Sequence, residues 1–250
     1  MARYQVVLAY DGADFKGFQR QKNARTVQSA FETALRALGW TGKSLLSAGR
    51  TDSGVHAVGQ VVAFDFEWSH DEVDLLRALN ASLPVDIAAR EVHLTARDFH
   101  PRYDALARRY EYRVFCDPIR DPLRERYAWR VWPEVRMASM NQAASYLIGE
   151  HDFGAFGAPP RKGGRTQRVI YQACWREAGR DLLLEITGNA FLFHMVRKLV
   201  SLLVEIGHGK QEIGAVEGFL DGVQPENWQG LAPPQGLTLM EVTYPAVNPE

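Results

Sequence analysis

The chain has 250 residues, 46% of them hydrophobic, which suits one large domain or two small ones with a buried core. Its formal net charge of −1 excludes an overall basic protein, so any affinity for a polyanion must come from local clusters. The two cysteines, Cys116 and Cys174, offer neither a disulfide framework nor a zinc-ligand spacing, which is typical of a reduced cytoplasmic protein.

The sequence contains no pattern that favours secretion or a membrane span. Met1 is followed by a strand-like pattern, not by the apolar core of a signal peptide. The longest apolar stretch, residues 190–206, is interrupted by charged side chains that include Arg197 and Glu205. We therefore expect a cytoplasmic protein without a membrane partner.

The first half of the sequence alternates strand and helix patterns. Thr26 can cap the first helix, whose apolar residues recur at helical spacing. The predicted elements are, in chain order, a strand at 4–10, a helix at 26–39, a strand at 59–66, a helix at 71–80 and a strand within 85–94.

The second half mixes strands and helices in a similar proportion. Its predicted elements are a strand at 109–115, a helix at 137–149, strands at 168–177 and 181–187, a helix at 190–206 and a strand at 237–244. Neither half has the strict alternation of a doubly wound parallel sheet, so we predict an α+β fold with mainly antiparallel sheets. We predict two domains, residues 1–104 and residues 105–250.

The most informative motif is GRTDSGVHA at residues 49–57. It places the carboxylate of Asp52 and the guanidinium of Arg50 in a short turn that leads into a strand. The flanking glycines allow unusual backbone angles and the close approach of a ligand. The simpler interpretation is a structural turn in which Asp52 bonds its own backbone.

Further motifs follow one another along the chain: YDG at 10–12, GFQRQ at 17–21, FHPRY at 99–103, RRYEY at 108–112, GNAFLFHMVR at 188–197 and APPQGL at 232–237. Together with GRTDSGVHA, and in this order, they resemble the transfer-RNA pseudouridine synthase A family from about residue 4 to residue 244. The resemblance implies two ferredoxin-like, or RRM-like, halves whose sheets join into one large sheet with a central RNA-binding cleft. It also implies a homodimer.

The activity that the resemblance implies is isomerisation of uridine to pseudouridine in transfer RNA, at positions 38, 39 and 40 of the anticodon arm. The C1′–N1 bond breaks, and the uracil turns and rejoins the sugar through C5. Atoms are neither gained nor lost, so we expect no cofactor and no metal, which agrees with a chain that lacks nucleotide-binding motifs. The target base must first leave the stack.

Three residues are predicted to be catalytic. Asp52 can act as a covalent nucleophile, or as a base and electrostatic partner. Tyr110 matches the family's active-site tyrosine, whose ring can stack on the flipped uracil, whereas Tyr112 is interpreted as sheet packing. Arg197 lies at the margin of a polar helix stripe, and the resemblance implies that it pairs with Asp52. By the same resemblance, Arg50 occupies the space that the base leaves and binds phosphate.

Two further segments are predicted to bind the substrate. The first mixes aromatic and basic side chains, a composition that suits contact with unstacked RNA, although a linker packed on the sheet is the simpler interpretation. The second is the basic loop at 161–168, which a solvated surface would also explain. The predicted contacts are Phe99, His100, Pro101, Arg102 and Tyr103 in the first segment, and Arg161, Lys162 and Arg165 in the second.

Two alternative functions compete with the isomerase interpretation. A non-catalytic RNA-binding module would need aromatic platforms and basic loops but no ionised Asp52. A metal-dependent hydrolase would use Asp52 and His56, but the sequence offers no second carboxylate or histidine at ligand spacing.

Overall fold

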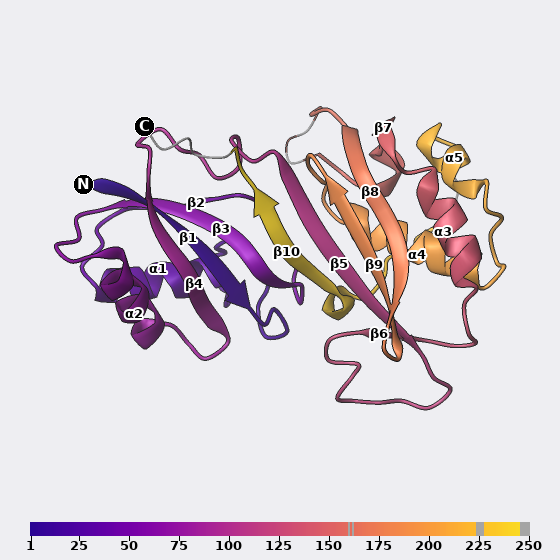
Figure 1. Ribbon diagram of the computed structural model, residues 1–250, viewed down its shortest axis with the longest axis horizontal. Helices are drawn as coiled ribbons and strands as arrows, with labels where there is room; N and C mark the ends of the chain where they lie inside the picture. The colour runs from indigo at the N-terminus through magenta and orange to yellow at the C-terminus, as the bar shows by residue number, and fades with distance from the viewer. Residues whose placement is uncertain (160, 162, 224–227, 246–250) are drawn as a thin grey trace. The chain divides into compact units, whose positions relative to one another are not determined.

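The computed structural model describes residues 1–159, 161, 163–223 and 228–245. The contacts within the chain define two compact units (Figure 1). The first unit comprises Met1–Leu106 and Thr238–Glu250, and the second comprises Ala107–Leu237. The predicted division into residues 1–104 and 105–250 stays a prediction, and the contacts add that the C-terminal strand groups with the first unit.

The first unit has the connectivity of a ferredoxin-like fold. Its strands β4, β1, β3 and β2 are antiparallel neighbours in that order, and β10 pairs with β3 in parallel. A β-α-β-β-α-β chain with this order is the split β-α-β arrangement. The elements are β1 (Ala2–Tyr10), α1 (Val27–Ala37), β2 (Leu46–Ser47), β3 (His56–Phe66), α2 (Glu72–Ser82), β4 (Ile87–Thr95) and β10 (Leu237–Thr243).

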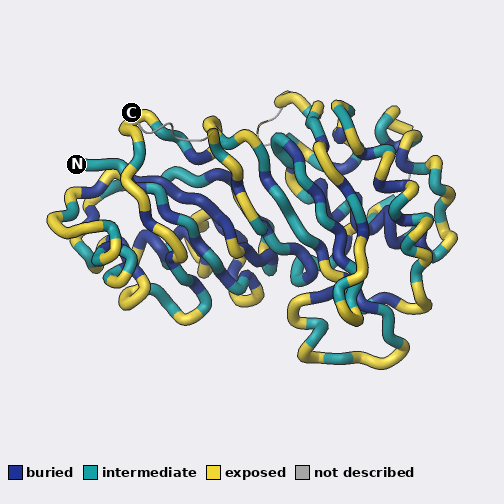
Figure 2. The backbone as a smooth tube through the Cα atoms, viewed as in Figure 1, coloured by how far each residue is buried: buried dark blue, intermediate teal, exposed yellow. Residues whose placement is uncertain are grey.

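An aromatic cluster lies between the sheet and α1 in the first unit. The Phe64 ring centroid lies 6.2 Å from that of Tyr4 in β1 and 6.0 Å from that of Phe31 in α1. Alternate residues of β1 are buried, as expected for a strand with one face against the core. The strand β3 is buried along most of its length, as Figure 2 shows. Thr26 caps α1 through a reciprocal pair of bonds with Ser29, as its sequence position predicted.

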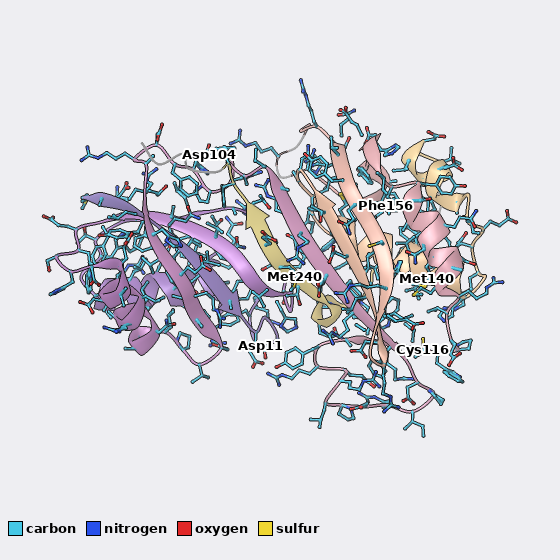
Figure 3. The ribbon with its side chains drawn as sticks, viewed as in Figure 1. Asp11, Asp104, Cys116, Met140, Phe156 and Met240 are labelled. Carbon is cyan, nitrogen blue, oxygen red and sulfur yellow. The ribbon has the colours of Figure 1, made fainter. Side chains whose placement is uncertain are left out.

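The close pairing of β3 with β10 depends on Gly59. A side chain at this position would collide with the carbonyl of Met240, which is labelled in Figure 3. Glycine therefore allows the C-terminal strand to lie against β3, directly after the GRTDSGVHA motif.

The second unit is also a mixed α and β structure with an antiparallel sheet. Its strands follow the order β5, β9, β8 and β7, and the short β6 pairs with β5 in parallel. The elements are β5 (Ala107–Cys116), β6 (Trp129–Val131), α3 (Met137–Ser145), β7 (Gly149–Asp152), the 3₁₀ turn η1 (Gly154–Phe156), β8 (Gln167–Ala178), β9 (Asp181–Gly188), α4 (Met195–Gly207), α5 (Ala215–Leu220) and the 3₁₀ turn η2 (Pro234–Gly236).

The two faces of the second sheet differ in chemistry. One face carries side chains that are almost completely buried, among them Tyr112, Leu184 and Trp175, and the fully buried Met140 and Phe156 (labelled in Figure 3) belong to the core of this unit. The alternate positions carry charged groups joined across strands, namely Arg109, Glu111, Arg176 and Glu185. This alternation fits a sheet with one face on the core and the other face in water.

The structure confirms the α+β class and the mainly antiparallel sheets. The strands β2, β6 and β7 and the helix α5 were not predicted. The helices expected at 137–149 and 190–206 are shorter than predicted, since the first ends at Ser145 and the second begins only at Met195. A single sheet joined from both halves, with a central cleft, stays a prediction. Within the part of the chain that the structure describes, no helix has the length and apolar character needed to cross a bilayer.

Candidate active site

The Asp52 loop is hydrogen-bonded to the end of β1 and to the segment that follows it. The hydroxyl groups of Tyr10 and Thr51 are hydrogen-bonded at 2.8 Å, and the Phe18 amide donates to the Thr51 carbonyl at 3.1 Å. The Gly54 amide donates to the Phe15 carbonyl at 3.3 Å. These bonds join the segment at residues 10–18 to the Asp52 motif.

Two glycines allow this close contact. Gly17 has a φ of +87°, and a side chain there would lie 2.8 Å from the Thr51 carbonyl oxygen. Gly12 packs directly on the Val55 carbonyl, without space for a Cβ atom. The loop and the segment around residues 12–17 therefore form one tightly packed backbone structure.

Asp52 lies in a turn, and its side chain is only half-buried. Its carbonyl accepts a hydrogen bond from the Val55 amide at 3.2 Å, so the turn expected from the sequence is present. The turn does not exclude a catalytic role, because it leaves the Asp52 residue partly accessible. Arg50, two residues earlier, is exposed, as a group that contacts a substrate phosphate needs to be.

His56 is buried and held by the same N-terminal segment. Its Nδ1 atom accepts a hydrogen bond from the Gly12 amide at 3.0 Å and lies 3.1 Å from Oδ1 of Asp11, labelled in Figure 3. Across the described residues, no group of three or more His, Cys, Asp or Glu side chains is placed to hold a metal ion. The hydrolase interpretation therefore lacks a ligand set in the part of the chain that is described.

The segment at 99–103 contains both anchors and exposed groups. The Phe99 ring packs edge-on against Tyr244 at 5.1 Å, and the Tyr244 hydroxyl donates to the Pro101 carbonyl at 2.7 Å. Tyr103 is 68% exposed, and its ring lies 4.3 Å from that of His100. The Arg102 guanidinium, also exposed, lies 5.9 Å from the Tyr103 ring. Phe99 and Pro101 thus hold the segment, while Arg102 and Tyr103 form its outer surface and His100 is half-buried.

Tyr110 lies in β5, opposite Ile186 of β9, and is half-buried. Its ring meets that of Phe191 edge-on, with centroids 5.1 Å apart. Tyr112, two residues along the same strand, is fully buried, and its hydroxyl donates to the Pro233 carbonyl at 2.7 Å. The structure therefore agrees with the assignment of Tyr112 to packing, and it leaves part of Tyr110 accessible.

Arg197 points into the second unit and is only 8% exposed. Its Nε donates to the Ala232 carbonyl at 2.8 Å, next to the Pro233 carbonyl that binds Tyr112. Burial raises the pKa of Tyr112, and the positive charge of Arg197 opposes this effect in part. Helical periodicity placed Arg197 only at the margin of the polar stripe, and the structure resolves this in favour of burial.

The basic loop is described only in part, since Lys162 lies outside the described residues. Arg161 and Arg165 are exposed. The Gly164 amide donates to the Arg161 carbonyl at 3.0 Å, and Gly163 has a φ of +74°, so the loop contains a tight turn.

The predicted catalytic residues belong to both units. Asp52 lies in the first unit, whereas Tyr110 and Arg197 lie in the second. The Asp52–Arg197 ion pair stays a prediction. Tyr10, Thr51 and Gln60, which lie behind the loop, were not predicted as site residues. The motif at 10–12, which begins with Tyr10, was a signal for the first of them.

Comparison with known proteins identifies relatives over nearly the whole chain. A family model described as tRNA pseudouridine synthase matches residues 6–104 and 143–245. A tRNA pseudouridine synthase A from a Geobacter species is 39% identical over 98% of this chain and 100% of its own length. The proteins of the same name from Limosilactobacillus fermentum and Citrifermentans bemidjiense are 37% and 38% identical, over 98% of this chain and 96% and 98% of their lengths.

A similarity to a solved structure is much weaker. The crystal structure of the archaeal box H/ACA sRNP Nop10–Cbf5 complex aligns with 82% of this chain and 44% of that chain, with a TM-score of 0.41 and 13% identity.

The matched residues include the Asp52 loop, the 99–103 segment and the helix that carries Arg197. The protein is therefore an enzyme of the isomerase class. The chain belongs to the tRNA pseudouridine synthase family, which confirms the resemblance drawn from its motifs. A non-catalytic RNA-binding module is not supported.

Proposed function

We propose that this enzyme converts uridine to pseudouridine at positions 38, 39 and 40 of the anticodon stem-loop of transfer RNA. The observation that carries this proposal is the combination of family membership over nearly the full chain with a half-buried aspartate in a fastened loop. The relatives are named tRNA pseudouridine synthase A, which supports the class of substrate.

In the proposed reaction, Asp52 acts after the target uridine has left the stack. Its carboxylate serves as the nucleophile, or as the base and electrostatic partner, while the C1′–N1 bond breaks and the C1′–C5 bond forms. The proton on C5 is lost and one is gained at N1, so the reaction is balanced without a cofactor or a metal. Arg50 takes the place of the flipped base.

Tyr110 and Arg197 complete the proposed site. The accessible part of the Tyr110 ring stacks on the uracil, and its hydroxyl takes part in proton transfer at C5. Arg197 pairs with Asp52 and orients its carboxylate. The burial of Arg197 supports this pairing, because a buried guanidinium is costly without an acidic partner. This arrangement requires a cleft at the junction of the two halves.

The transfer RNA contacts are proposed on two exposed surfaces. One is the outer surface of the 99–103 segment, where Tyr103 and Arg102 are exposed. The other is the basic loop with Arg161, Lys162 and Arg165. The proposed enzyme is cytoplasmic and homodimeric, and sedimentation of the purified protein tests the dimer.

The proposal is tested by incubating the protein with an unmodified transfer RNA transcript that carries uridines at positions 38, 39 and 40. Pseudouridine is then mapped by position. A transcript with cytidine at these three positions is the matched control, and EDTA is present throughout. We expect pseudouridine only at the three positions and none in the control. Modification at other positions, or none at all, contradicts the proposal.

A further inference from the structure

Behind the Asp52 loop lies a cluster of buried polar side chains that takes no part in the chemistry proposed above. It consists of Tyr10 at the end of β1, Gln60 in β3 and Thr51 in the loop, which we call the loop anchor. These residues are only 4%, 0% and 7% exposed, respectively. Polar groups at such depth are costly unless hydrogen bonds satisfy them, so their presence needs a physical reason.

The loop anchor holds the backbone on both sides of Arg50. The Gln60 amide donates to the Gly49 carbonyl at 3.2 Å, and its oxygen accepts from the Val61 amide at 3.1 Å. The Tyr10 hydroxyl binds the Thr51 hydroxyl at 2.8 Å. Thr51 directly precedes Asp52 in the chain. The backbone around Arg50 and Asp52 is therefore held in place by side chains of the neighbouring strands β1 and β3.

The hydroxyl of Tyr10 stays protonated at neutral pH. Burial raises the pKa of Tyr10 to about 12, against the opposing effect of hydrogen bonds from Thr51 and Gln60. Its hydroxyl therefore keeps its proton, so it can both donate and accept hydrogen bonds within the cluster. A fully satisfied buried network of this kind restricts its members to one arrangement.

We propose that Tyr10, Thr51 and Gln60 are positioning residues, which hold Asp52 in its reactive geometry through the loop backbone. The inference rests on the proposed role of Asp52. None of the three side chains needs to touch the substrate. Since a small misplacement of a catalytic group lowers the rate strongly, loss of the anchor should slow the chemical step and leave transfer RNA binding unchanged.

The test compares Tyr10→Phe, Thr51→Val and Thr51→Ser under single-turnover conditions with saturating transfer RNA. We expect the first two to react about 10- to 100-fold more slowly, with an unchanged dissociation constant. Thr51→Ser keeps the hydroxyl and should restore most of the rate. The double variant Tyr10→Phe/Thr51→Val should be no slower than the slower single variant, because both remove the same bond. Tyr171→Phe, which alters an exposed tyrosine, is the matched control.

If the three residues had only a structural role, the rate would fall in proportion to the loss of folded protein. Melting temperatures and hydrogen exchange of the peptide 49–55 are measured for each variant. Faster exchange in this peptide, in a protein that is otherwise folded, supports the inference. It is overturned if Tyr10→Phe and Thr51→Val react at the wild-type rate, if Thr51→Ser is as slow as Thr51→Val, or if the rate loss only follows the loss of folded protein. Wild-type activity of Asp52→Asn would instead contradict the proposed function.

Discussion

Arg197 and Ala232 exchange two hydrogen bonds of opposite direction. Nε of Arg197 donates to the Ala232 carbonyl at 2.8 Å, and the Ala232 amide donates to the Arg197 carbonyl at 3.1 Å. The pair joins the first turn of α4 to the APPQGL motif, whose Pro233 carbonyl accepts the Tyr112 hydroxyl. Arg197 therefore has a structural role in the second unit in addition to its proposed pairing with Asp52.

Because Arg197 has both a structural and a proposed catalytic role, we predict that Arg197→Met lowers both stability and activity. The buried Ala232 carbonyl would lose a charged donor, and an unsatisfied buried group of this kind costs about 1–3 kcal/mol. For a chain of this length, such a loss lowers the melting temperature by several degrees. Lys210→Met, at an exposed residue after α4, is the control. A variant with unchanged melting temperature and rate would contradict the buried role of Arg197.

Substitutions of Tyr110 separate its ring from its hydroxyl. Tyr110→Phe keeps the stacking surface and should lose about 10²-fold or more in turnover, as removal of an acid–base group does. Tyr110→Leu also loses the ring and should be more severely impaired. Tyr112→Phe is the matched control: it loses the bond to Pro233 and about 0.5–1.5 kcal/mol of stability, with little change in rate. Wild-type turnover in both Tyr110 variants would return Tyr110 to sheet packing.

The buried Tyr10 hydroxyl predicts a loss of stability in strong alkali. Its pKa is near 10 in the unfolded chain and is raised to about 12 by burial in the folded protein. The contribution of Tyr10 to the free energy of unfolding is therefore complete below pH 10. It is lost as the pH rises towards 12, because Tyr10 releases its proton at a lower pH in the unfolded chain than in the folded protein. Denaturant unfolding should show that the free energy of unfolding is lower at pH 11 than at pH 9, with about 1 kcal/mol of this decrease coming from Tyr10. In Tyr10→Phe the decrease should be smaller by that amount, and an identical decrease in both proteins would contradict the raised pKa.

The basic loop predicts a change in the salt dependence of transfer RNA binding. Arg161 and Arg165 are exposed, and each phosphate contact contributes about 0.7–0.9 to the log–log salt slope. Arg161→Gln/Arg165→Gln should flatten the slope by about 1.5, with little change in the single-turnover rate at saturating RNA. Arg90→Gln/Arg180→Gln removes two other exposed arginines and serves as the control. An unchanged slope would show that the RNA is bound elsewhere.

Local sequence patterns were sufficient for much of the fold. Thr26 was predicted as a helix cap and forms a capping box with Ser29, and the strand around Tyr110 lies where alternation placed it. Such patterns depend on neighbours in sequence, and they are visible in a single chain. The two-residue β2 has no periodicity to detect, and it exists because its backbone pairs with β3.

The start of α4 shows where local patterns fail. The apolar run continues through Phe191, Leu192 and Phe193, so periodicity extended the helix to residue 190. In the structure, His194 adopts a left-handed conformation with a φ of 66°, and the Phe193 amide binds the Ala158 carbonyl. The bond between Phe193 and Ala158 joins distant parts of the sequence, and no local pattern encodes it. The same reason explains why the direction of Arg197 was ambiguous, since it depends on Ala232.

The candidate site was predictable mainly through its motifs. The spacing of Arg50, Asp52 and the glycines identified the loop. Its hydrogen bonds to Tyr10 and Gln60 could not be predicted in this way, because they depend on the pairing of β1 with β3. Composition offered no indication of RNA binding, because the basic residues are balanced by acidic ones over the whole chain.

The most direct test of the account is the activity of Asp52→Asn on unmodified transfer RNA, with pseudouridine mapped by position. Asparagine keeps the shape of the side chain but removes its charge and nucleophilicity. Asp14→Asn, an exposed aspartate in the neighbouring segment, is the matched control. The proposed role of Asp52 predicts no pseudouridine above background with Asp52→Asn, unchanged transfer RNA affinity, and wild-type activity with Asp14→Asn. Wild-type formation of pseudouridine by Asp52→Asn would contradict it.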